Sequence, residues 1–219
     1  MCGSSGPGPG SDVVIRVGID EVGRGPLAGP VTACAVALGD WRPAPPLVLK
    51  DSKKISARRR ETLAQQIQAH AVAVGLGWAS VEEIDQLNIL QATFLAMYRA
   101  VQGLVASLDG QEPVQLLVDG HLNPATHAQD LNWPWPTETC VGGDGLVAEI
   151  SAASIVAKVA RDTHMQELDQ QYPGYGLASH AGYGTAQHLA ALNSLGACPA
   201  HRRSFAPVAR RVAESTHGL

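Results

Sequence analysis

Four acidic side chains follow apolar segments at the points where those segments would leave a sheet: Asp20, Glu21, Asp119 and Asp144. A single acid in such a place is usually a turn or capping residue, because Asp favours turns. Three sites of this form in one chain instead favour convergence, since the ends of neighbouring strands in one sheet lie close together. We therefore expect the four carboxylates to share one site.

Converging carboxylates predict a cation site. Like charges held close together raise one another's pKa unless a cation neutralises them. An all-oxygen ligand set favours Mg²⁺ or Mn²⁺, and the chain has no His/Cys spacing that would suggest zinc. Two such ions roughly 4 Å apart form the arrangement that cuts phosphodiesters by in-line displacement. The acids thus point to metal-dependent hydrolysis of a phosphodiester.

The loop after the first two acids reads Gly23-Arg24-Gly25. Glycine lets the main chain approach a ligand closely, and an arginine fork suits phosphate or sugar oxygens. A plain tight turn would use the same residues. The loop does not match a nucleotide-binding loop, because GRGPLAG lacks the Gly-Lys-Ser/Thr ending and the GxGxxG spacing. Pro26 and Pro30 would also oppose the helix that both of those motifs need.

A predicted helix over 146–162 carries one polar stripe. Its members Ser151, Ser154 and Lys158 are spaced by three and four residues, so they share a face. The stripe has two explanations: hydroxyls that bond back to the helix carbonyls, or a surface aimed at a phosphate near Asp144. The sequence leaves both open.

The chain has a net charge of −4 at pH 7 but concentrates its basic residues in two places. Residues 50–60 hold six basic residues, Lys53 and Lys54 among them, and one acid. The second group is Arg202, Arg203, Arg210 and Arg211. Such clusters are either solvated faces or contacts for phosphates. The net charge argues against a protein that binds nucleic acid through general basicity.

Apolar periodicity predicts an α/β fold in which strands and helices interleave. We expect strands over 13–20, 31–38, 72–79, 114–118 and 137–141, and helices over 56–70, 88–105, from 146 and over 185–195. Ser56 is the expected N-cap of the first helix. The sequence shows no internal repeat and no boundary between two large domains.

Residues 1–12 are rich in Gly, Ser and Pro, and we expect a flexible lead-in rather than a secretory signal. Residues 13–219 would form one domain with a helical C-terminal extension from about residue 172. The four cysteines are scattered without a CxxC pair, which favours a reduced, cytoplasmic setting. On the sequence alone, no apolar stretch is long enough to predict a membrane span.

These segments together resemble the ribonuclease HII family, the type 2 bacterial ribonucleases H. The resemblance covers about 17–208 and rests on motifs in the family's order: GIDEVGRGPLAGPV, DSKKIS, EIDQLNILQATFLAM, VDG, GGDGLVAEISAASIVAKVARD, HAGYGT and HRRSFAPV. It implies a ribonuclease H-like fold, with a mixed central sheet flanked by helices and a small helical C-terminal part. It also implies that the catalytic, metal-binding acids are Asp20, Glu21, Asp119 and Asp144.

The resemblance implies a substrate as well. Family members cut the RNA strand of RNA/DNA hybrids and incise a DNA duplex on the 5′ side of an embedded ribonucleotide, in ribonucleotide excision and removal of RNA primers. They leave 5′-phosphate and 3′-hydroxyl ends. By resemblance, Gly23, Arg24 and Gly25 would read the 2′-hydroxyl at the RNA-to-DNA junction, and Tyr183 would stack on the following sugar. The expected phosphate contacts are Lys53, Lys54, Ser151, Ser154 and Lys158.

The expected mechanism uses two Mg²⁺ or Mn²⁺ ions. One would lower the pKa of the attacking water and the other would stabilise the departing 3′-oxygen, with no covalent intermediate. We expect a monomer without a membrane partner. The chain departs from the commonest family pattern at Gly142, Gly145, Ala181 and His121, which removes two lysines and a hydroxyl. We therefore expect weaker phosphate affinity than in members that keep those lysines.

Three alternatives compete with this interpretation. A module that binds hybrids without cutting them has no use for four converging acids, which repel nucleic acid in the absence of a metal. Ribonuclease HIII is a related nuclease, but its family carries an extra N-terminal domain where about a dozen residues precede the first predicted strand here. A phosphate-loop NTPase needs a lysine motif that this chain lacks.

Overall fold

A computed structural model describes residues 14–41, 55–108 and 113–217, with side chains described as far as residue 214. The predicted lead-in over 1–12 lies outside these ranges. So do two of the predicted phosphate contacts, Lys53 and Lys54.

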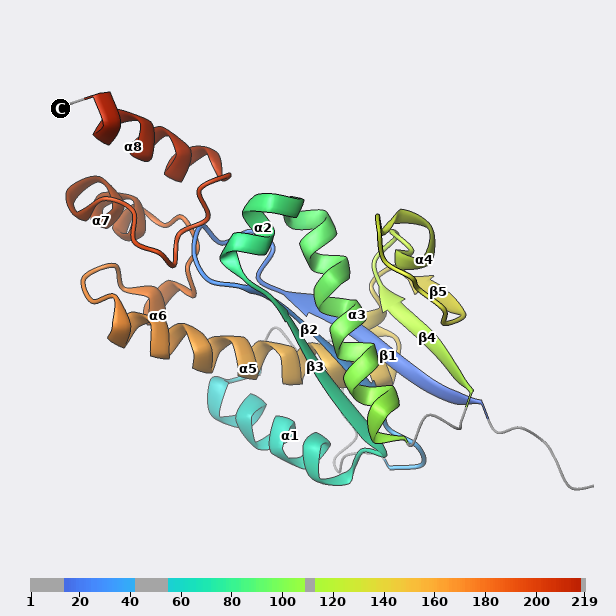
Figure 1. Ribbon diagram of the computed structural model, residues 1–219. Coiled ribbons are helices and arrows are strands. Elements are labelled where there is room, and N and C mark those ends of the chain that lie inside the picture. The colour runs from blue at the N-terminus through green and yellow to red at the C-terminus, as the bar shows by residue number, and fades with distance from the viewer. Residues whose placement is uncertain (1–13, 42–54, 109–112, 218–219) are drawn as a thin grey trace, which may run out of the picture.

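A mixed sheet runs through the centre of the described chain, with its five strands in the order β3-β2-β1-β4-β5 (Figure 1). The strands are β1 (Ile15–Val22), β2 (Val31–Ala37), β3 (Ala73–Ala79), β4 (Val114–Asp119) and β5 (Thr137–Cys140). β1, β2 and β3 pair antiparallel, whereas β1, β4 and β5 run parallel. The predicted fold class is confirmed, and each predicted strand boundary lies within two residues of the observed one.

Helices cover both faces of this sheet (Figure 1). On one face α3 (Ile89–Ser107) shares a core with Val17 and Ile19 of β1. On the other face α1 (Ala57–His70) and α5 (Ala148–Gln171) share a core with Cys34 and Val36 of β2. Successive strand residues point to opposite faces, so strands covered on both sides are apolar throughout rather than alternating. β2 is buried along its whole length for this reason.

One described helix, α3, is long and apolar enough to cross a membrane by length and composition, with a mean hydropathy of 1.2. The expectation that no stretch of the chain has these properties is therefore wrong. The apolar residues of α3 that are buried, among them Phe94, Val101 and Leu104, belong to the core beneath the sheet. Packing in the core of the domain accounts for the hydropathy of this helix.

α5 lies directly against β1. A Cβ atom on Gly18 would collide with the main chain at Glu149 and Ile150, so only glycine permits this approach. The helix begins at Ala148 and continues to Gln171, nine residues beyond the predicted end at 162. Its second half is half-exposed and polar on one side, which weakens the apolar periodicity that predicts helices.

Local capping sets several helix boundaries. Ser56 caps α1 as predicted, accepting a bond from the Arg59 N–H. Asn88 caps α3 in the same way. The sequence prediction missed α2 (Val81–Leu87), which begins with a reciprocal bond pair between Ser80 and Glu83. It also missed the short α4 (Pro124–His127).

After Gln171 the regular elements of the described chain are helices: α6 (Leu177–His180), α7 (Ala186–Leu195) and α8 (Ala206–His217). This part is attached to the loop between β1 and β2. Ala28 forms an isolated β-bridge with His201, and the Leu27 N–H donates to the Gly182 carbonyl over 2.8 Å. The C-terminal helices thus lie next to the residues that follow the first two acids (Figure 1).

Candidate active site

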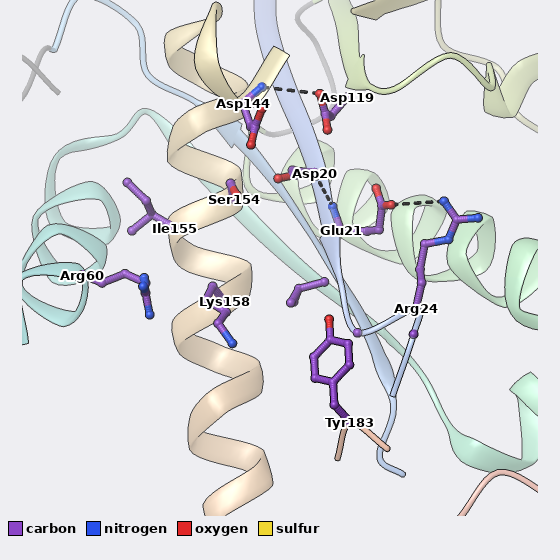
Figure 2. A pocket seen from close by; sticks show the side chains of 13 residues that line it. Asp20, Glu21, Arg24, Arg60, Asp119, Asp144, Ser154, Ile155, Lys158 and Tyr183 are labelled. Atoms are coloured by element: carbon purple, nitrogen blue, oxygen red, sulfur yellow. Dashed lines mark hydrogen bonds and ion pairs between the residues drawn. The ribbon is translucent and has the colours of Figure 1, made fainter. Parts of the chain in front are cut away.

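A cavity of about 460 Å³ opens where β1, β4 and α5 meet. Figure 2 shows the side chains around it. The lining contains all four predicted acids and six of the nine other predicted site residues. Its members are Asp20, Glu21, Gly23, Arg24, Gly25, Asp119, Asp144, Ser154, Lys158 and Tyr183, with Val22, Arg60 and Ile155.

The parallel pairing of β1 and β4 brings the first three acids together. Ile19 pairs with Val118, so Asp20 and Asp119 follow at the same end of adjacent strands. Asp20 is 7% exposed, while Glu21 and Asp119 are half-buried. Successive side chains of a strand point to opposite faces of the sheet. At the end of the sheet, however, the side chains of Asp20, Glu21 and Asp119 all reach the same cavity.

The fourth acid reaches the cavity through a turn. Asp144 lies in a short 3₁₀ segment, η2 (Gly143–Gly145), between β5 and α5. Gly142 precedes it in the left-handed region with φ of 69°, a conformation that glycine adopts without strain. The Asp144 N–H lies 3.4 Å from Oδ1 of Asp119, which fixes the turn beside the end of β4.

The surroundings of Asp20 and Glu21 disfavour the ionised form of both carboxyl groups. Burial raises the pKa of Asp20 well above its ordinary value, and the charges of Glu21 and Asp119 raise it further against a hydrogen bond from Ser154. Burial also raises the pKa of Glu21, with Arg24 opposing the shift and Asp119 adding to it. A bound cation would relieve both effects, because it favours the ionised carboxylates.

The oxygen-only donor set fits a hard divalent cation such as Mg²⁺ or Mn²⁺. Within the part of the chain that the structure describes, no three His, Cys, Asp or Glu side chains form a group that could already hold an ion. The backbone therefore brings the acids to one cavity without gathering their carboxylates.

The loop Gly23-Arg24-Gly25 forms the wall of the cavity next to the acids. Arg24 reaches back to Glu21, with its NH1 atom 3.4 Å from Oε1. Tyr183, which is 49% exposed, lies beside the loop (Figure 2). A Cβ atom on Gly25 would lie 3.2 Å from Cε1 of the Tyr183 ring. The loop and the tyrosine, far apart in sequence, are thus in close contact.

Two cations lie at the other end of the cavity, on α1 and α5 (Figure 2). Lys158 donates to Asp162 over 2.6 Å, and NH1 of Arg60 lies 3.9 Å from the same carboxylate. Two cations facing one acid leave a positive charge in excess. The sequence prediction placed Arg60 within a basic cluster but did not select it as a site residue. The signal available in the sequence was the place of Arg60 in the first turn of the predicted helix, within the basic cluster.

The polar stripe of α5 is divided between two environments. Ser154 and Lys158 line the cavity, and their contact with a phosphate stays a prediction. Ser151 does not: it is fully buried, and its Oγ has no hydrogen-bond partner among the described residues. The first turn of α5 lies directly against Gly18 of β1, and Ser151 has no exposed surface. The predicted contact of Ser151 with a phosphate is inconsistent with this position.

Comparisons with known proteins show what this chain is similar to. The family model described as Ribonuclease HII matches residues 17–208. The ribonuclease HII of Acidovorax sp. (strain JS42) is 58% identical over 193 residues, which cover 88% of this chain and 86% of that protein. The ribonuclease H2 of Pyrococcus horikoshii OT3 has a similar fold, with a TM-score of 0.64 at 21% identity, over 93% of this chain and 99% of that one.

A ribonuclease HIII, Bst-RNase HIII in complex with Mn²⁺, is also similar in fold. Its TM-score is 0.67 at 16% identity, and the match covers 93% of this chain and 71% of that chain. At this identity the likeness concerns the fold alone.

Proposed function

The chain belongs to the ribonuclease HII family, whose members are metal-dependent endonucleases of the ribonuclease H type, and on that premise we propose how its cavity recognises and cuts RNA joined to DNA. The substrates are RNA/DNA hybrids and DNA duplexes that contain ribonucleotides. Cleavage falls on the 5′ side of the ribonucleotide and leaves 5′-phosphate and 3′-hydroxyl ends. The observation that carries the proposal is the meeting of four acids with the Gly23–Gly25 loop and Tyr183 in one cavity.

Asp20, Glu21, Asp119 and Asp144 would hold two divalent cations, Mg²⁺ or Mn²⁺. Such ions, when bound, neutralise the scissile phosphate and lower the pKa of the attacking water. The protein contributes the placement of the carboxylates by β1, β4 and the turn before α5. The raised pKa of Asp20 and Glu21 supports this assignment, since the cavity is unfavourable for carboxylates without a compensating positive charge.

The other walls of the cavity would orient the strand. The close-fitting Gly23–Gly25 main chain can test for a 2′-hydroxyl, which is the local difference between RNA and DNA. Tyr183 offers its exposed ring as a stacking surface for the next sugar. Lys158 and Arg60 would contact a phosphate neighbouring the scissile one, which positions the backbone without reading sequence.

A direct test uses a DNA duplex with one ribonucleotide, a long RNA/DNA hybrid and an all-DNA duplex. Each is incubated with Mg²⁺, Mn²⁺ or a chelator, and the products are sized on a denaturing gel. We expect metal-dependent cleavage of the first two substrates only, with the cut immediately 5′ of the single ribonucleotide. Binding of hybrids without any cleavage would instead identify a binding module. We further propose that the protein acts as a monomer in the cytoplasm, which sedimentation and fractionation would test.

A further inference from the structure

His201 and Arg202 are adjacent in sequence, and each is connected to a different half of the proposed substrate-reading site. Both are buried, at 1% and 0% exposure. They lie in the segment between α7 and α8, more than 170 residues from the loop that contains Gly23 and Arg24. The charge and ring chemistry of this pair have no part in the catalytic proposal above.

The Arg202 guanidinium holds the main chain of the loop. Its NH2 group donates to the Gly23 carbonyl over 2.6 Å, its NH1 group to the Arg24 carbonyl over 3.0 Å, and Nε to the Gly29 carbonyl over 2.8 Å. Every hydrogen bond that the described structure gives this guanidinium therefore ends on a carbonyl. Within the described ranges no carboxylate forms an ion pair with this guanidinium, although the charge of Asp85 acts on it. Burying an arginine without an ion-pair partner is costly, which points to a specific role.

These bonds determine where the loop amides point. In a planar trans peptide, the N–H of one residue is directed opposite to the carbonyl of the residue before it. Because the carbonyls of Gly23 and Arg24 face Arg202 in the interior, the N–H groups of Arg24 and Gly25 are directed away from it. Neither N–H donates to a main-chain or side-chain acceptor in the described residues. Two free donors thus remain on a loop that lines the cavity.

A second chain of bonds runs from His201 to Tyr183. Nδ1 of His188 lies 2.9 Å from the Tyr183 carbonyl, and its Nε2 lies 3.1 Å from Nε2 of His201. Nδ1 of His201 accepts from the Cys198 N–H over 3.1 Å. One tautomer assignment satisfies every link: His188 donates from Nδ1 to Tyr183, and His201 donates from Nε2 to His188. Burial lowers the pKa of both rings, that of His201 to about 4, so both are neutral at pH 7.

We propose that Arg202 and the His188–His201 pair are positioning residues. They hold the N–H groups of the loop and the ring of Tyr183 in the relative positions needed to recognise the 2′-hydroxyl of a ribonucleotide. The proposal rests on the proposed function and concerns how the reading site is kept in shape. The hydrogen bonds of Arg202 to the loop and of the histidine pair to Tyr183 meet at one segment, residues 201–202, and Gly25 lies against Tyr183.

Binding measurements test the role of Arg202. In an Asp144→Asn background that prevents cleavage, the Kd is measured for a duplex with one ribonucleotide and for the all-DNA duplex of the same sequence. Arg202→Lys keeps the charge but loses the fork that spans two carbonyls. We expect it to reduce the preference for the ribonucleotide about tenfold, the effect of losing one or two hydrogen bonds, and to leave the Kd for DNA unchanged. Arg203→Lys, exposed and adjacent, is the matched control.

Activity measurements on two His188 variants test the role of the histidine pair, one variant losing the donor to Tyr183 and the other keeping it. His188→Asn places an amide nitrogen near the position of Nδ1 and keeps a donor for Tyr183, whereas His188→Gln places its amide near Nε2 and loses that donor. We expect His188→Gln to lower kcat/KM for a single ribonucleotide about tenfold more than for a long hybrid, and His188→Asn to restore the ratio. Melting followed by circular dichroism confirms that each variant is folded.

The possible results separate the two proposals. Wild-type protein that does not incise at a single ribonucleotide rejects the proposed function. Wild-type protein that does so, with folded Arg202→Lys and His188→Gln variants that keep the full ribonucleotide preference, rejects the positioning role alone. An unfolded Arg202→Lys variant leaves the decision to the His188 pair.

Discussion

The main-chain N–H of Asp144 lies 3.4 Å from Oδ1 of Asp119, which joins the turn before α5 to the end of β4. This contact holds the third and fourth acids next to each other in the cavity lining. The acids therefore come from three separate segments, and the cavity exists only when the sheet, the turn and α5 are assembled.

Asp119→Asn should abolish most of the cleavage while leaving the fold intact, because the amide keeps the size of the side chain and loses its charge. We expect the rate on a long hybrid in Mg²⁺ or Mn²⁺ to fall at least about a hundredfold. Initial rates on labelled hybrid measure the effect. Asp130→Asn, an exposed change outside the cavity, is the control. A rate close to wild type for Asp119→Asn would remove this residue from the site.

Tyr183→Ala should impair incision at a single ribonucleotide more than cleavage of a long hybrid, since the proposed stacking role of the ring lies at the junction. Loss of one stacking contact corresponds to roughly a tenfold effect or more. Tyr183→Phe retains the ring and should behave like wild type. The ratio of kcat/KM on the two substrates is the measurement, and an equal loss on both would contradict a junction-specific role.

Arg60→Gln should weaken substrate binding and also make it less sensitive to salt. Removal of one phosphate contact lowers the slope of log K against log salt concentration by about 0.9. Fluorescence anisotropy at several salt concentrations gives this slope. Arg58→Gln, exposed on the same helix and outside the cavity lining, should leave it unchanged. Identical slopes for wild type and Arg60→Gln would show that Arg60 makes no phosphate contact.

The buried pair His188 and His201 should make the protein less stable in acid. Burial, with His188 second, lowers the pKa of His201 to about 4, below the value of about 6.5 in the unfolded chain. The unfolded state then binds more protons, so stability is complete above pH 6.5 and is lost as the pH falls from there towards 4. We expect the free energy of unfolding to fall by about 2 kcal/mol between pH 7 and pH 5 from this residue.

Urea denaturation at both pH values measures that change. The groups that face the pair are His180, Tyr175 and Cys198, and none is a carboxylate. His201→Gln should flatten the pH dependence relative to wild type, whatever its stability at pH 7. The exposed change His127→Gln should not. An unchanged slope in His201→Gln would show that this ring does not titrate as inferred.

Gly18→Ala should destabilise the fold, because a Cβ there collides with the main chain of Glu149 and Ile150 and would force α5 away from β1. We expect a loss of about 2 kcal/mol, together with lower activity, since α5 carries Ser154 and Lys158. Gly103→Ala on α3 meets only Gly75, at 4.0 Å, and should be neutral or stabilising. Equal stability of both variants in urea would contradict the close approach of α5.

Much of the fold was predictable because its signals are local. The apolar strands, the helices and the cap at Ser56 follow from periodicity and hydrogen bonds within a few residues. The capping pair at Ser80 and Glu83 is also a local signal that the sequence contains. The helix α2 was nevertheless not predicted, because its seven residues are too few to show a clear helical periodicity of apolar residues. The four acids were identified by type, place at strand ends and family resemblance, without knowledge of the strand order.

The sequence by itself determined which groups are proposed to carry the chemistry, because carboxylates, glycines and an aromatic ring are properties of residue types. Only the tertiary structure decided which of them share a cavity. The pairing of β1 with β4 put Asp20 beside Asp119, and the approach of α5 to Gly18 buried Ser151 while leaving Lys158 open. The arginines near the C-terminus were read as a charge cluster, yet Arg202 is buried beneath a loop more than 170 residues away. Contacts at that distance depend on chain packing, which local patterns do not encode.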